Sequence, residues 1–136
     1  MTAVPVTADR TKFLRTVLVL DAAVTGANGL AYLVAAPLLS ELLGPETGLL
    51  RALGAFLLAY GAAVAVLGTR REISPAGTKA VIGVNIVWTL ASVAAVAFGM
   101  LAFTTMGAVW GIVQALTVGA LAELQIMGLR KARRQV

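Results

Sequence analysis

Asp21 is the residue of this chain best suited to chemistry, because it lies within a long apolar run. Asp21, Thr25, Asn28 and Tyr32 follow one another at i, i+4, i+7 and i+11, which places them on one face of a helix. A carboxylate near the centre of a membrane helix costs about 2.5–3.5 kcal/mol on insertion scales, so such a residue usually has a partner or a function. We therefore predict that this face points into protein.

A second polar face lies in another apolar run and carries Asn85, Thr89 and Ser92. Asp21, Asn85 and Glu123 each stand six or seven residues from a basic residue that ends their apolar run. At about 1.5 Å per helical residue, all three would lie roughly 10 Å from the same end of a bundle. The sequence therefore predicts a polar layer at that depth.

This layer has two alternative interpretations. In the functional one, Asp21 and Glu123, with Asn85, form a proton or cation site in which two neighbouring carboxylates share a proton. In the structural one, Asp21 forms hydrogen bonds with Asn85 or a threonine, and Glu123 meets Arg130 or a lipid headgroup. Nothing in the spacing decides between them.

The last apolar run carries polar residues on two opposite faces. Gln114 and Gln125 lie on one face with Leu121, whereas Glu123 lies on the other. Only one face can point at Asp21. If the glutamines face the bundle, Glu123 would face a neighbouring subunit or lipid.

The overall composition is that of a membrane protein. Hydrophobic residues make up 60% of the 136 residues and charged residues 12%, and the mean hydropathy is +0.93. Four apolar runs, at about 13–36, 49–68, 78–101 and 106–128, each reach the roughly 20 residues needed to cross a bilayer. We predict an all-α fold, a four-helix transmembrane bundle that forms a single domain over residues 1–136.

Basic residues indicate how this bundle is oriented. Cytoplasmic loops collect Lys and Arg, and Arg51 is the only basic residue that falls on the other side of the predicted topology. We predict a multi-pass protein of the bacterial cytoplasmic membrane with both termini inside (N-in/C-in). The basic residues on the inner side are Arg10, Lys12, Arg15, Arg70, Arg71, Lys79, Arg130, Lys131, Arg133 and Arg134.

The first outer loop is itself partly apolar. Leucines recur at helical spacing over residues 38–43, directly after Pro37, which suits the first turn of a helix. The segment would be either a short helix in the outer interface or the frayed end of the first membrane helix.

Small residues form ribbons along two of the apolar runs. Such ribbons let helix backbones approach closely, inside one bundle or between subunits. The lipid bilayer is the expected partner, and a homo-oligomer or a larger membrane complex would bury more of these short helices. The glycines predicted to pack are Gly54, Gly61, Gly68, Gly107, Gly111 and Gly119.

Missing residue types exclude much enzyme chemistry. The chain has no cysteine and no histidine, which removes thiolate nucleophiles, common zinc and haem ligands and the usual proton shuttle. The basic residues cluster at the ends of apolar runs and form no groove with aromatic side chains, so nucleic acid is not an expected partner. We predict no catalytic residue, metal site or cofactor.

Four segments carry a resemblance to known proteins: 14–15 (LR), 20–26 (LDAAVTG), 28–32 (NGLAY) and 85–88 (NIVW), together with the basic C-terminal tail. With them, the chain resembles small four-helix integral membrane proteins of actinobacteria, which are largely uncharacterised. Its length and helix number are also similar to those of DoxX-like proteins. The resemblance implies a four-helix layout and no activity.

Three functions compete. The first is a non-enzymatic membrane module, either an accessory subunit or a homo-oligomer. The second is a small proton- or cation-coupled transporter or channel in which Asp21 titrates and Asn28, Tyr32, Asn85 and Gln114 line the path. The third is a membrane enzyme acting on a lipid-soluble substrate, with Asp21 or Glu123 as general acid or base and Tyr32 or Tyr60 orienting the substrate.

Overall fold

The computed structural model describes residues 3–100 and 103–133, and this part of the chain is all-helical. Four of its helices are long and apolar enough to cross a membrane, so the predicted all-α fold with four long apolar helices is confirmed. The helices are α1 (Ala3–Val34), α2 (Ala36–Leu43), α3 (Thr47–Thr69), α4 (Pro75–Ala97) and α5 (Thr105–Arg133).

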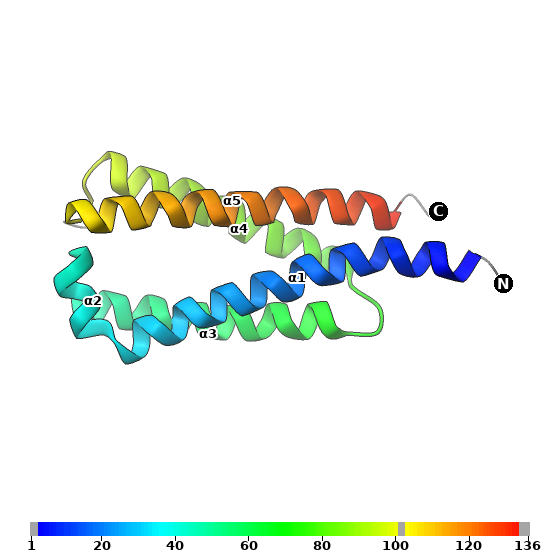
Figure 1. Ribbon diagram of the computed structural model, residues 1–136, viewed down its shortest axis with the longest axis horizontal. Coiled ribbons are helices and arrows are strands. Elements are labelled where there is room, and N and C mark those ends of the chain that lie inside the picture. Colours follow the sequence, from blue (N-terminus) through cyan, green and yellow to red (C-terminus); the bar gives the residue numbers. More distant parts are fainter. Residues whose placement is uncertain (1–2, 101–102, 134–136) are drawn as a thin grey trace.

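The long helices form two antiparallel pairs. Helix α1 packs along α3 and α4 packs along α5, while α1 also contacts α5 and joins the pairs. Figure 1 shows the start of α1 and the end of α5 at one end of the bundle and α2 at the other. Near the termini, buried apolar side chains from all four long helices form one cluster: Leu14, Leu18, Ala22, Val64, Val81, Ile82 and Leu129.

Local sequence signals explain where the helices begin. The Ser74 hydroxyl accepts a hydrogen bond from the backbone N–H of Gly77 (3.0 Å) and caps α4, which starts with Pro75. Thr104 caps α5 in the same way through the N–H of Gly107 (3.0 Å). Both caps satisfy backbone donors that a helix leaves free at its start.

Helix α2 is a separate short helix and not a continuation of α1. Helix α1 ends at Val34, and α2 carries Pro37 in its first turn, where a missing N–H costs nothing. Gly44 follows with φ 109°, a conformation that favours glycine. The carbonyl of Leu42 accepts a hydrogen bond from the Thr104 hydroxyl (2.7 Å), which ties α2 to the start of α5.

Several helix ends differ from the ends of the apolar runs, and the largest difference is at α1, which begins at Ala3, ten residues before the first run. Helix α4 stops at Ala97, and Gly99 then adopts φ 63°; Leu101, the end of the third apolar run, lies outside the described residues. Helix α5 continues past residue 128 to Arg133. Its Lys131 ammonium lies 4.4 Å from the ring centroid of Phe13 in α1, so this basic extension packs on the bundle.

Glycines of α3 bring its backbone against α1. A Cβ atom built on Gly54 would lie 2.8 Å from the carbonyl oxygen of Gly29, and one on Gly61 would lie 3.0 Å from the nitrogen of Gly26. Gly68 continues the seam against Leu18 of α1. At Gly54 and Gly61 the contacts are therefore between backbones, which only residues without a side chain allow.

The glycines of α5 face two different neighbours. Gly107 lies against the carbonyl of Leu43 in α2, and a Cβ on Gly111 would lie 2.8 Å from Val96 of α4. Gly119 is less constrained, because its Cβ would be 3.5 Å from Thr89, an ordinary contact. Within the described residues, the predicted packing glycines thus lie between helices of one chain.

We predict that Gly54→Ala lowers the free energy of unfolding by about 1–3 kcal/mol, because the new methyl group must push the α1 backbone aside. Thermal unfolding followed by circular dichroism in lipid nanodiscs measures this. Gly83→Ala in α4 is the control, since a Cβ there meets nothing within 4 Å, and alanine favours a helix by about 1 kcal/mol. Equal stability of the two variants would contradict the proposed seam.

Candidate functional site

The Asp21 carboxyl group is buried between the helices and held by side chains from three of them. Asp21 as a whole is only 1% exposed. The Oδ1 atom accepts a hydrogen bond from the Thr25 hydroxyl (2.9 Å) one turn further along α1. The Oδ2 atom accepts from the Asn85 amide of α4 (2.8 Å) and from the Gln125 amide of α5 (2.6 Å).

Further hydrogen bonds bring the fourth long helix into this cluster. The Asn85 Nδ2 atom also donates to Gln125 Oε1 (3.0 Å). The hydroxyl of Tyr60, on α3, lies 3.1 Å from Asn85 Oδ1 and 3.2 Å from the carbonyl oxygen of Val81. We call Asp21, Thr25, Tyr60, Asn85 and Gln125 the Asp21 network; it joins all four long helices.

The hydrogen-bonding pattern suits an acceptor at its centre. An ionised carboxylate can only accept hydrogen bonds, and Asp21 receives three from neutral donors. No salt bridge to Asp21 occurs within the described residues. The described residues also contain no cluster of three His, Cys, Asp or Glu side chains that could hold a metal ion.

Glu123 lies apart from the network. Its side chain is exposed, whereas Gln125, two residues later and on the nearly opposite face of α5, is fully buried. The glutamine face of α5 therefore points into the bundle and Glu123 points outward. Asp21 and Glu123 do not form a carboxylate pair in this structure.

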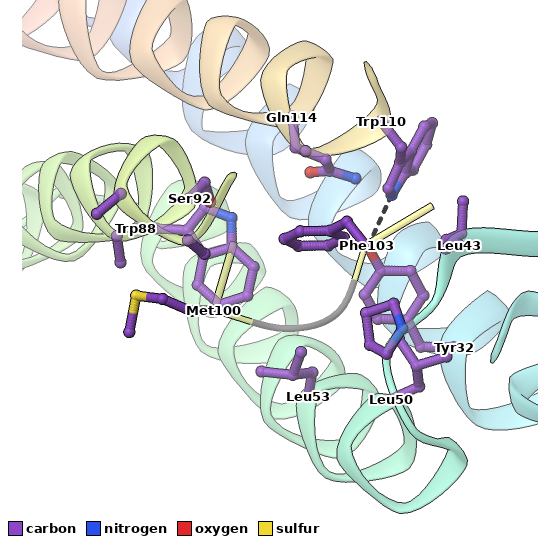
Figure 2. A pocket seen from close by; sticks show the side chains of 15 residues that line it. Tyr32, Leu43, Leu50, Leu53, Trp88, Ser92, Met100, Phe103, Trp110 and Gln114 are labelled. Atoms are coloured by element: carbon purple, nitrogen blue, oxygen red, sulfur yellow. Dashed lines mark hydrogen bonds between the residues drawn. The ribbon is translucent and has the colours of Figure 1, made fainter. Parts of the chain in front are cut away.

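The other predicted site residues lie nearer to α2. Tyr32 is 7% exposed, and its hydroxyl oxygen accepts a hydrogen bond from the indole nitrogen of Trp110 (2.9 Å). Tyr32 and Gln114 both line a cavity of about 380 Å³ between α1, α3, α4 and α5 (Figure 2). Asn28 lines a neighbouring cavity under α2, of about 360 Å³.

A narrow gap of about 20 Å³ lies between the large cavity and the Asp21 network. Trp88 and Gln114 line both the gap and the large cavity. Thr25, Tyr60 and Asn85 of the network line the gap from the other side. Asp21 itself lines none of these three cavities.

Sequence reasoning did not single out Gln125 and Trp110 as site residues, and it named Tyr60 only as a side chain that could orient a substrate. Gln125 is at nearly the same depth as Glu123, and its polarity within an apolar run is the one signal for it. Tyr60 and Trp110 are aromatic residues in apolar helices, a setting in which both types are common. Only the rotation of each helix shows that their polar atoms face Asn85 and Tyr32.

Comparisons with protein-family models, with curated proteins and with solved structures find no match to this chain. Two features of the geometry bear on function: the buried Asp21 network and the uncharged cavity beside it.

We predict that Asp21→Leu destabilises the bundle far more than Asp21→Asn does. Leucine leaves the Thr25, Asn85 and Gln125 donors without their acceptor, at about 1–2 kcal/mol per lost contact between apolar helices. An asparagine oxygen still accepts from the amides. Thermal unfolding in nanodiscs measures both variants. Glu123→Leu is the control and should unfold like the parent protein; parental stability of Asp21→Leu would show that the network does not hold the helices.

Proposed function

We propose that this chain is an integral membrane protein that crosses the bacterial cytoplasmic membrane four times, with both termini inside the cell. The support is the long apolar helices together with the distribution of charge. Exposed Arg70, Arg71 and Lys79 belong to the end of the bundle that also holds the termini. Exposed Glu41 and Glu46 belong to the α2 end. The excess of basic residues favours the cytoplasm for the first end.

Arg15 strengthens the argument for this end. Its guanidinium donates hydrogen bonds to the carbonyl oxygens of Gly68 and Arg70, both at 2.7 Å. These carbonyls belong to the C-terminal end of α3, where backbone acceptors lack helical partners. The positive charge is thus held at the end of the helix pair, which supports a place for this end at the membrane interface.

We predict that a membrane-impermeant maleimide labels Glu46→Cys on intact cells and labels Arg71→Cys only after permeabilisation. Both positions are exposed, and the chain has no cysteine of its own, so each variant reports one site. The unsubstituted protein is the control and should stay unlabelled. The opposite labelling pattern would overturn the proposed orientation.

Within the membrane, we infer that the chain acts as a non-enzymatic module, an accessory subunit or a homo-oligomer. The three hydrogen bonds that the buried Asp21 carboxylate accepts are the observation that carries this proposal. A transporter or an enzyme that uses Asp21 needs the carboxylate to open onto a path or a substrate, but its oxygens accept hydrogen bonds from other helices, and it lines none of the described cavities. The geometry therefore favours a structural role for Asp21, in which its hydrogen bonds hold the helices together.

Helix α4 is the best candidate for a partner-binding surface. Only 11% of its most apolar stretch is buried, compared with 39% in α1 and in α5. Val87 and Leu90 of α4 are each 65% exposed. A helix that contributes so little to its own bundle has most of its surface available to another membrane helix.

We predict that native mass measurement, on protein released from its own membrane into lipid particles, gives an assembly larger than the 14.0 kDa chain. Identical copies would make the module a homo-oligomer, and a different co-purifying membrane protein would make it an accessory subunit. Val87→Phe should weaken the assembly. Val66→Phe, on the exposed face of α3, is the matched control. A monomer without any partner would contradict the proposal.

A further inference from the structure

The large cavity near α2 has the size and walls of a small-molecule site. Its volume of about 380 Å³ falls within the roughly 300–1,000 Å³ typical of ligand pockets, which are mostly apolar with a few polar groups. Four aromatic side chains, Tyr32, Trp88, Phe103 and Trp110, contribute to its walls. In the view of Figure 2, Trp88 lies on one side and Tyr32 on the other, with Gln114 extending from α5 above them.

The described lining contains no charged residue but several unused polar groups. The Gln114 amide and the Ser92 hydroxyl form no hydrogen bond within the described residues. Tyr32 accepts from Trp110, which leaves its own hydroxyl proton free to donate. A polar group without a hydrogen-bond partner is unfavourable in apolar surroundings. These groups therefore favour a neutral ligand that can both donate and accept a hydrogen bond.

The cavity is closed toward the termini and less tightly packed between α3 and α4. Toward the termini it narrows to the gap of about 20 Å³, which Tyr60 and Asn85 of the Asp21 network line. Between α3 and α4, which contact each other less than the other neighbouring long helices do, the wall is weakest. A lipid-soluble molecule would reach the cavity from the bilayer through this side.

From these observations we propose that the cavity binds a slender, neutral, lipid-soluble alcohol, of the long-chain or isoprenoid class, with its hydroxyl group at Gln114 and Tyr32. The hydroxyl can donate to the Gln114 amide oxygen and accept from the Tyr32 hydroxyl. The apolar chain lies between the aromatic walls. The proposal stands whether or not the chain assembles with a partner.

Intrinsic fluorescence tests this directly, because both tryptophans of the chain, Trp88 and Trp110, line the cavity. The probe is ω-bromoundecanol, whose bromine quenches tryptophan, added to the purified protein in lipid nanodiscs. Bromoundecane, which lacks the hydroxyl group, is the matched control probe. We expect saturable quenching by the alcohol and only a linear, non-saturating decrease with the alkane.

Two variants assign the saturable signal to this cavity. Gln114→Leu removes the amide and should weaken binding of the alcohol about five- to tenfold, the value of one hydrogen bond. Ala95→Phe fills the space, since Ala95 is part of the lining, and should abolish saturation. Thr117→Leu on the exposed face of α5 should change nothing. If Ala95→Phe does not fold by circular dichroism, Ala91→Phe replaces it.

Linear quenching by both probes would overturn the proposal, because it would reflect ordinary contact of the tryptophans with bilayer lipid. Saturable quenching that both Gln114→Leu and Ala95→Phe leave unchanged would also overturn it, since the alcohol would then bind elsewhere. The measurement is made on whatever assembly purifies. Its outcome is therefore separate from that of the native mass experiment.

Discussion

A carboxyl group buried among apolar helices must be given hydrogen-bond donors, and the way Asp21 obtains them constrains the whole bundle. Thr25 comes from the same helix, but Asn85 and Gln125 can reach Oδ2 only if α4 and α5 stand at one depth and one rotation relative to α1. Tyr60 then fixes α3 through Asn85. In an apolar environment hydrophobic burial hardly distinguishes one helix arrangement from another, so such polar contacts carry much of the specificity.

The glycine seam explains why the bundle is asymmetric. Gly54 and Gly61 let α3 approach α1 backbone to backbone, and α5 lies against α1 through Gly128, whose Cβ would be 3.1 Å from the Cα of Leu14. Helix α4 joins mainly through α5 and the Asn85 contact. Close approach on one side therefore leaves space on the other, and the cavity opens where α3 and α4 diverge beyond the Asp21 network.

Much of the fold could be predicted from the sequence, because four apolar runs near 20 residues have few other stable forms. The contact between Asp21 and Asn85 could be anticipated from their common depth. The partner on α5 could not, because Glu123 and Gln125 lie at nearly the same depth and only the rotation of α5 distinguishes them. That rotation follows from distant contacts, such as Gly128 with Leu14. For the segment that forms α2 the sequence left two alternatives, because a leucine-rich segment after Pro37 suits both a separate short helix and the frayed end of the first long helix.

The polar groups at the two ends of the bundle serve different purposes. Those of the Asp21 network hold the helices together, whereas those of the cavity near α2 are available to a ligand. Near the termini, the amides of Asn85 and Gln125 are buried, and both donate a hydrogen bond to Asp21. Near α2, the Gln114 amide is half-buried and has no partner in the described part of the chain, although it lies on the same face of α5 as Gln125. Leucine at position 114 would pack these walls at lower cost. A glutamine there is accounted for by a ligand that supplies the missing hydrogen bond.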